Sequence, residues 1–157
     1  MKDAIIELSV KRLQTEGLRF SLDSLARELK VSKKTIYKYF STKEELAVAI
    51  YRKFYGDAAA KIAALLESKG SLFEILSVYS QSFLMKKEEI FNKYALNEAI
   101  RTYTLSCHEK LWEQIEPLFP EDMRGAARAI IDGAYEKACA SAVPPEKITD
   151  CLIKIIC

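Results

Sequence analysis

The stretch SLDSLARELKVSKKTIYKYFSTKEEL, residues 21–46, decides how this chain folds. Ser21 and Ser32 are residue types that cap the start of a helix, and each precedes a short run whose apolar side chains repeat with helical spacing. Lys30 and Val31 lie between the two runs. The pattern predicts two short helices joined by a tight turn, with Ile36 and Phe40 of the second helix facing inward.

The sequence on either side of this stretch extends the helical pattern. Apolar spacing predicts a first helix over about residues 2–16. Ser41 and Thr42 each stand three residues before a glutamate, which gives two overlapping capping boxes for the start of a fourth helix. That helix is expected to continue to residues 69–70, so that it joins the two parts of the chain without a flexible linker.

The rest of the chain also predicts helices. Only five glycines and four prolines interrupt the sequence. We expect helices over residues 71–87, 89–117 with a break near 92–97, 121–142 and 145–156. The fold class is therefore all-α, with a three-helix helix-turn-helix domain over residues 1–50 and a helical domain over residues 51–157.

The charge is divided unevenly between these two parts. Residues 1–55 hold 12 Lys and Arg against 7 Asp and Glu, a net of +5, whereas the remaining residues hold 12 against 15, a net of −3, which together give +2. A basic module before a mildly acidic one indicates that only the first part meets a polyanion. No apolar run approaches the length of a membrane span, so we expect a cytoplasmic protein that does not enter a membrane.

Several spaced elements of residues 3–50 resemble the DNA-binding signature of the tetracycline-repressor (TetR) family. They are the segment from Ser21 to Ala26, the segment from Val31 to Phe40, and Lys43 to Leu46. In that signature a Val-Ser turn precedes a Thr-x-Tyr-x-x-Phe recognition helix, and a lysine opens the fourth helix. Lys30 departs from it, because the family most often has glycine there and the turn commonly needs a left-handed backbone.

The resemblance implies a transcription regulator that binds a palindromic operator in double-stranded DNA as a homodimer. Lysine can donate to guanine edges or phosphates, and threonine and tyrosine hydroxyls can reach the same oxygens. For Tyr39, packing in the core is an alternative to DNA contact. The implied DNA-binding residues are Lys33, Lys34, Thr35, Tyr37, Lys38 and Tyr39 at the major groove, Lys43 as a phosphate clamp, and Ser21 and Thr42 as helpers.

In this family the second domain dimerises through its last two long helices. The apolar residues of the two C-terminal helices exceed what one small core obviously needs, although they can also complete the core of the monomer. The candidate dimer-interface residues are Met123, Ala127, Ile130, Ile131, Ala134, Ala138, Ile148, Leu152, Ile155 and Ile156.

The family's second domain often encloses a small-molecule pocket. A small hydrophobic or aromatic effector that enters it would release a repressor from its operator. At helical spacing, the same aromatic residues are also typical of plain core. The candidate pocket residues are Tyr79, Phe83, Phe91, Tyr94, Tyr103, His108 and Trp112.

Other function classes have less support. Cys107 and His108 are adjacent, but neighbours on a helix point about 100° apart, so they do not form a nucleophile pair. The sequence shows no spacing typical of metal ligands and no phosphate-binding glycine loop, so we expect no catalysis, metal or cofactor. The alternatives left open are a DNA-binding dimer that responds to a protein partner or to no effector, and an activator.

Overall fold

The computed structural model describes residues 1–16, 21–85 and 98–156. Within these ranges there is no strand, so the all-α fold is confirmed. The elements are α1 (Lys2–Glu16), α2 (Leu22–Glu28), α3 (Lys33–Tyr39), α4 (Lys43–Glu67), α5 (Leu72–Met85), α7 (Glu98–Ile115), the 3-10 turns η2 (Glu116–Leu118) and η3 (Glu121–Met123), α8 (Arg124–Ala140) and α9 (Pro145–Ile156). No helix in the described part of the chain is both long and apolar enough to cross a bilayer.

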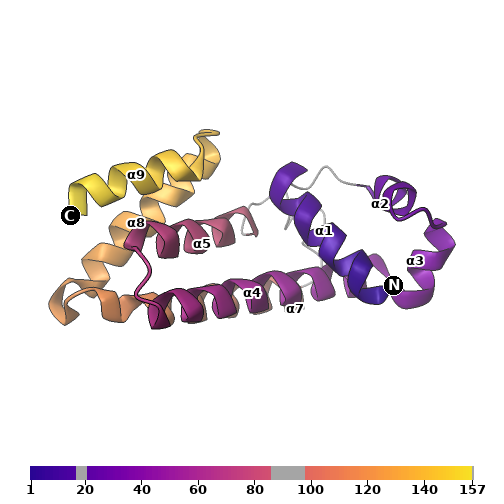
Figure 1. Ribbon diagram of the computed structural model, residues 1–157, viewed down its shortest axis with the longest axis horizontal. Coiled ribbons are helices and arrows are strands. Elements are labelled where there is room, and N and C mark those ends of the chain that lie inside the picture. Colours follow the sequence, from indigo (N-terminus) through magenta and orange to yellow (C-terminus); the bar gives the residue numbers. More distant parts are fainter. Residues whose placement is uncertain (17–20, 86–97, 157) are drawn as a thin grey trace.

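The molecule is elongated, and α4 runs along most of its length (Figure 1). Helices α1, α2 and α3 lie at one end of α4, while α8 and α9 lie toward the other end beyond α5. With 25 residues, α4 is about 37 Å long. A single continuous helix therefore connects the N-terminal helices with the C-terminal bundle.

The predicted helix starts in the N-terminal part are confirmed by their caps. The amide of Ser24 donates to Ser21 Oγ over 3.2 Å, and the Ser21 amide donates back to Ser24 Oγ over 3.3 Å. Ser32 Oγ accepts from the Thr35 amide over 3.1 Å. Each bond satisfies an amide that has no partner inside its own helix, so α2 and α3 begin where these serines stand.

The two overlapping capping boxes before α4 resolve into one arrangement. Thr42 is the N-cap, because its Oγ1 accepts from the Glu45 amide over 3.1 Å. The Glu45 carboxylate accepts from the amide of Ser41 over 2.8 Å instead of from the cap residue itself. Thr42 therefore sets the first residue of α4 as Lys43, and Ser41 contributes its backbone.

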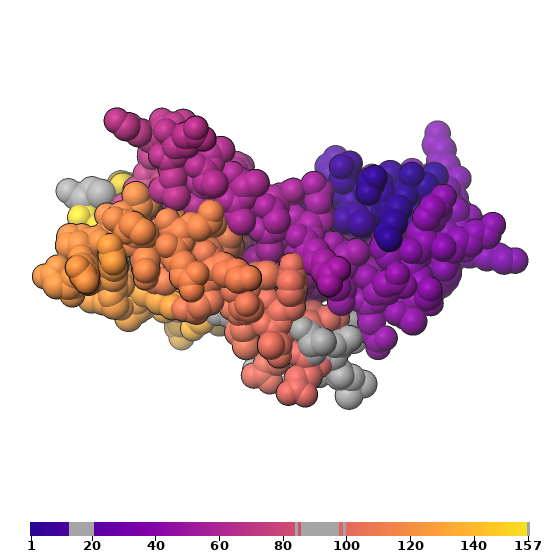
Figure 2. Space-filling view, turned by 90° about the horizontal axis from the view of Figure 1, so that it is seen from below, coloured from indigo at the N-terminus to yellow at the C-terminus, as the bar shows by residue number. Residues whose placement is uncertain are grey.

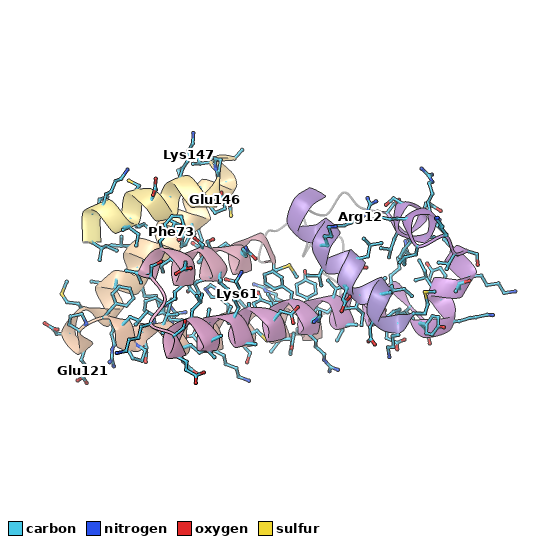
Figure 3. The ribbon with its side chains drawn as sticks, viewed as in Figure 1. Arg12, Lys61, Phe73, Glu121, Glu146 and Lys147 are labelled. Atoms are coloured by element: carbon cyan, nitrogen blue, oxygen red, sulfur yellow. The ribbon has the colours of Figure 1, made fainter. Side chains whose placement is uncertain are left out.

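A small apolar core holds the first three helices against α4. Ile5, Leu25, Ile36, Phe40 and Leu46 are all buried, which confirms that Ile36 and Phe40 face inward. The guanidinium of Arg12 extends from α1 toward α2 and donates to Glu28, with Nε 2.9 Å from Oε2 (Figure 3). Because α3 uses its inner face for this core, its position relative to α4 is set.

The turn between α2 and α3 has a left-handed backbone at Lys30, the position at which the sequence departs from the TetR signature. Lys30 has φ 54°. The Val31 amide donates to Ala26 O over 2.9 Å, which is the bond pattern of a helix that ends in a left-handed residue. A residue with a Cβ atom adopts this backbone conformation at a cost of about 1 kcal/mol, whereas glycine adopts it without that strain.

We therefore expect Lys30→Gly to stabilise the protein by roughly 0.5–1 kcal/mol in urea unfolding, because the strain at φ 54° disappears. Lys61→Gly is the control, since this exposed position lies inside α4 (Lys43–Glu67), where glycine costs about 1 kcal/mol. A loss of stability in Lys30→Gly would contradict the left-handed turn.

The C-terminal helices pack around α4 and α5. Ile62, Leu76 and Leu111 are fully buried among them. The Tyr135 hydroxyl of α8 lies 2.7 Å from Thr149 Oγ1 of α9 and donates to Leu76 O of α5 over 3.3 Å. Burial, partly offset by the hydrogen bond to Thr149, raises the pKa of Tyr135 to about 12. This buried hydroxyl therefore joins three helices.

Several predicted helix boundaries differ from the structure. The fourth helix, expected to continue to residues 69–70, ends at Glu67. The helix predicted over 121–142 begins as α8 at Arg124, because residues after Pro120 form the turn η3. The helix predicted to reach residue 117 ends at Ile115, since Pro117 has no amide for the next bond and lies in η2. The expected break near residues 92–97 lies outside the described residues.

Candidate nucleic-acid interface

Helix α3 presents one face to the core and the other to the surface. Ile36 is 1% exposed, whereas Tyr37 and Tyr39 are each 40% exposed. Tyr39 therefore lies at the surface and not in the core. Lys33, Lys34 and Lys38 are exposed on the same short helix. The outer face of α3 consists of long side chains that carry amines and hydroxyls, which can reach beyond the backbone of the helix.

The flanking candidates also lie at the surface. Lys43 is the first residue of α4 and is exposed, as are Ser21 and Thr42. The Ser21 and Thr42 hydroxyl oxygens accept from backbone amides, so each hydroxyl hydrogen remains available to donate to a phosphate. Thr35 is half-buried, and its hydroxyl lies 2.9 Å from that of Ser32, so it is less available than the others.

The lysines of this surface differ in their ion pairs. Among the described residues, Lys34, Lys38 and Lys43 form no ion pair. Lys33 does, with its Nζ 2.7 Å from Oδ2 of Asp23 in α2. The surface therefore presents three unpaired ammonium groups to a polyanion, and these attract phosphates through long-range electrostatics.

The sequence did not predict the ion pair between Asp23 and Lys33. Asp23 lies in the first turn of α2, where a carboxylate interacts favourably with the helix dipole. The two residues are ten positions apart on different helices, so no helical spacing relates them. Only the angle between α2 and α3 brings the carboxylate to the ammonium group.

The candidate dimer residues divide into two groups. Ile131, Ala138 and Leu152 are buried in the chain's own core, and Ala127, Ala134 and Ile148 are half-buried against it. Met123, Ile130, Ile155 and Ile156 remain exposed on η3, α8 and α9. Figure 2 shows that α8 forms a broad surface at the end of the molecule opposite α1–α3. The exposed group is the part that remains available to a second copy.

Most of the described pocket candidates lie in one aromatic cluster. Tyr79, Phe83, His108 and Trp112 are buried and pack directly on one another, with the ring centroids of Tyr79 and His108 5.1 Å apart. Tyr103 is half-buried nearer the start of α7. Phe91 and Tyr94 lie outside the described residues.

A hydrogen-bond network runs through this aromatic cluster to Asp132 of α8. The Tyr79 hydroxyl donates to Asp132 Oδ1 over 2.7 Å and lies 3.1 Å from His108 Nε2. His108 Nδ1 lies 2.7 Å from Ser82 Oγ. Arg128 Nε donates to Asp132 Oδ2 over 3.3 Å. The network joins α5, α7 and α8 and gives each buried polar group a partner.

This network changes the acidity of its members. Burial opposes ionisation of Asp132, but the nearby His108 and the hydrogen bonds from Tyr79 and Arg128 outweigh it and hold the pKa of Asp132 below its usual value. Burial raises the pKa of Tyr79, and the hydrogen bond to Asp132 raises it further. A hydrogen bond from Arg128 lowers the pKa of Glu109. Asp132 is therefore ionised at neutral pH and serves as the shared acceptor.

A groove in the described part of the molecule lies elsewhere, between α1 and α4. Its volume is about 680 Å³. The floor is apolar, and both rims carry charges of both signs. The lining residues are Lys2, Asp3, Ile6, Glu7, Phe40, Glu45, Val48, Ala49, Arg52 and Lys53. None of the predicted pocket residues contributes to this groove.

The known proteins that this chain resembles in sequence are bacterial regulators. Residues 5–54 match the model of bacterial regulatory proteins, tetR family. The uncharacterized HTH-type transcriptional regulator YvaF of Bacillus subtilis (strain 168) is 23% identical over 124 residues, which make up 78% of this chain. The chain spans about 62% of the length of this curated relative.

A solved structure extends the likeness over the whole chain. The crystal structure of multidrug binding protein EbrR complexed with imidazole aligns with a TM-score of 0.50 and 18% identity. The alignment covers 98% of this chain and 93% of that chain. At this identity the likeness concerns the fold alone.

Proposed function

We propose that this chain, whose residues 5–54 match the model of bacterial regulatory proteins, tetR family, binds operator DNA as a homodimer and represses transcription. Regulators of this family are DNA-binding transcription factors and not enzymes. The observation that carries the proposal is the outer face of α3, where unpaired lysines and two exposed tyrosines project from a helix whose inner face is buried. DNA binding implies a place with the chromosome, in the cytoplasm.

In the proposed complex, α3 enters the major groove. Lys33, Lys34, Thr35, Tyr37, Lys38 and Tyr39 contact base edges and flanking phosphates there. Lys43 binds a phosphate from the start of α4, with the Ser21 and Thr42 hydroxyls beside it. Residues 1–50 then form the DNA-binding domain, and residues 51–157 form the domain for dimerisation and effector binding.

Selection of bound duplexes from a random pool tests DNA binding directly. We expect an enriched palindrome, because two copies of α3 related by a two-fold axis read inverted half-sites about 34 Å apart. Recovery of no enriched sequence would contradict sequence-specific binding. A non-palindromic consensus would contradict the symmetric dimer.

The proposed dimer interface consists of the exposed apolar side chains of η3, α8 and α9. Ile130 is 54% exposed and Ile155 is 73% exposed in the single chain. Burial of the exposed part of each side chain against a symmetry mate yields about 1–2 kcal/mol. An interface on the C-terminal helices leaves the two copies of α3 free to reach successive grooves.

We expect the double variant Ile130→Glu, Ile155→Glu to be monomeric at micromolar concentration, whereas the unchanged protein is dimeric. Four carboxylates would be buried in the symmetric interface, which costs several kcal/mol, yet the single chain loses no core contact. Light scattering measures the mass. Leu105→Glu, at an exposed position of α7, is the matched control and should stay dimeric. A monomeric unchanged protein would overturn the dimer proposal.

We further propose that a small hydrophobic or aromatic effector releases the repressor. Two observations support this: the aromatic cluster around Tyr79 lies in the helical domain, and α4 runs unbroken from that domain to α3. The relative EbrR is described as a multidrug binding protein. An effector that separates the helices of the cluster would tilt α4 and change the spacing of the two recognition helices.

The close packing of that cluster favours a second candidate, a dimer that responds to a protein partner or to no effector. Calorimetric titration with a panel of planar aromatic compounds, with and without the selected duplex, separates the two. If a compound lowers the affinity of the protein for DNA, DNA must lower the affinity of the protein for that compound by the same factor. A panel without any such compound would favour the second candidate. A reporter gene placed behind the selected operator tests the direction of regulation. Its expression falls in the presence of this protein if the protein represses and rises if it activates.

A further inference from the structure

Lys30 occupies the turn between α2 and α3 in a backbone conformation that suits glycine better. Its φ is 54°, and its amide donates to Arg27 O over 3.1 Å. The next amide, of Val31, donates to Ala26 O over 2.9 Å, so both bonds hold the turn in this form. Lysine adopts the conformation at a cost of about 1 kcal/mol relative to glycine. The geometry of the turn therefore does not account for a lysine at this position.

A second lysine adopts the same conformation far from α3. Lys69 lies just beyond the end of α4 and also has φ 54°. The amide of Gly70 donates to Leu65 O over 2.7 Å, which repeats the bond that spans the turn at Lys30. Both lysines are exposed. Since α4 is about 37 Å long, Lys69 lies at the end of this helix remote from α3. What distinguishes Lys30 is therefore its place and not its backbone.

The ammonium group of Lys30 has no carboxylate partner among the described residues. The acidic side chains of α2, Asp23 and Glu28, are both engaged elsewhere. Asp23 lies 2.7 Å from Lys33 Nζ, and Glu28 accepts from Arg12 Nε over 2.9 Å. Lys30 is therefore an exposed cation that the acids of the neighbouring helix do not neutralise.

The turn lies beside the end of α3 that enters the major groove in the proposed complex. Lys30 is two residues before Ser32, the N-cap of α3, and three before Lys33. Three steps of about 3.8 Å between successive Cα atoms place it within about 11 Å of Lys33. The turn and α3 lie together at the end of the molecule opposite α8 and α9 (Figure 1). The groove is about 12 Å wide and the first helix of such a motif crosses the DNA backbone, so Lys30 lies at the phosphates of the groove edge.

We propose that Lys30 is a phosphate-binding residue, whose ammonium group contacts the DNA backbone where the chain passes from α2 into the major groove. This inference rests on the proposed function, in which α3 enters that groove. A lysine that neutralises a phosphate releases counterions and strengthens binding whatever the base sequence. The contact compensates for the strained turn. Glycine at this position stabilises the free protein and weakens the complex.

Three substitutions of Lys30 separate its charge from its backbone. Lys30→Gly removes both the charge and the strain, Lys30→Gln removes the charge alone, and Lys30→Arg keeps both. Binding is measured by fluorescence anisotropy on two duplexes of equal length, the selected palindrome and a scrambled version. Titrations over about 50–200 mM salt give each affinity and its salt dependence.

We expect Lys30→Gly and Lys30→Gln to weaken binding to both duplexes by about three- to tenfold near 0.1 M salt. The slope of log affinity against log salt should become shallower by about 0.9 for each bound copy of the chain. Lys30→Arg should bind both duplexes as the unchanged protein does, because the guanidinium group also pairs with phosphate.

Lys69→Gly is the matched control, because it removes an exposed lysine with the same φ from the far end of α4. Both glycine variants should shift the midpoint of urea unfolding to higher urea by a similar amount, since both lose the same backbone strain. Only Lys30→Gly should lose affinity for DNA. A variant that is more stable and yet binds more weakly has not lost affinity by unfolding.

The outcomes are distinct. Unchanged affinity and salt slope in Lys30→Gly would overturn the phosphate contact. An equal loss in Lys69→Gly would also overturn it, because general charge would then explain the effect. A loss in Lys30→Arg as large as in Lys30→Gln would show that the charge does not bind. An unchanged protein that binds both duplexes alike would instead contradict the proposed function, while weaker binding of Lys30→Gly to both would still support the contact.

Discussion

Tyr37→Ala and Lys43→Ala should each weaken binding to the selected operator, by severalfold to about a hundredfold, without unfolding the protein. Tyr37 is 40% exposed on the outer face of α3, and Lys43 is exposed at the start of α4, so neither truncation opens a cavity in the core. The loss corresponds to a contact worth about 1–3 kcal/mol in the complex.

The two variants should differ in how they lose affinity. If Lys43 binds a phosphate, Lys43→Ala weakens operator and scrambled duplexes about equally and reduces the salt slope by about 1. Tyr37→Ala should leave the slope nearly unchanged, since tyrosine carries no charge. Lys61→Ala is the control, because Lys61 lies in the C-terminal half of α4, far from α3 (Figure 3). Unchanged affinity at fixed salt would remove the tested residue from the interface.

Asp132→Ala should lower the free energy of unfolding by about 2–3 kcal/mol in urea at neutral pH. The substitution removes the acceptor that Tyr79 and Arg128 share in a largely buried site, so Tyr79 keeps only His108 and Arg128 keeps only Glu109 as a side-chain partner. Asp150→Ala is the matched control. Asp150 is an exposed carboxylate of α9 that lies 3.9 Å from Lys154, and its loss should cost less than about 0.5 kcal/mol.

The effect of Asp132→Ala should also depend on pH. The pKa of Asp132 is lower in the folded protein than in the unfolded chain. Its contribution is therefore fully present above the unfolded value of about 3.9 and is lost as pH falls through the folded pKa. The difference in stability between the unchanged protein and Asp132→Ala should narrow below about pH 4. A difference that stays constant into acid would contradict an ionised Asp132.

The local sequence correctly predicted the helix starts of the N-terminal part of the fold. Ser21, Ser32 and Thr42 cap α2, α3 and α4 as their residue types indicate, and Lys30 adopts the left-handed turn expected at its position. These features depend on bonds between residues only a few positions apart, which any chain with this sequence can form. The outward lysines of α3 follow from the same helical period.

Long-range partners could not be predicted in this way. Tyr79 and Asp132 are 53 residues apart, and nothing in their spacing indicates a hydrogen bond. The spacing of Arg128 and Asp132, four residues apart on a helix, did offer a signal for their ion pair. The aromatic residues selected for a pocket were identified by type, and type alone does not distinguish a cavity wall from a packed cluster.

The amino-acid sequence by itself determined where the helices of the N-terminal part begin and which face of α3 is basic, because caps, dipoles and the helical period act within one or two turns. Only the tertiary structure decided that Ile131 is fully buried while the adjacent Ile130 is 54% exposed. It also decided that Lys33 alone among the lysines of α3 meets a carboxylate. Both outcomes depend on the angle at which a second helix crosses the first, and that angle is set by packing over the whole core.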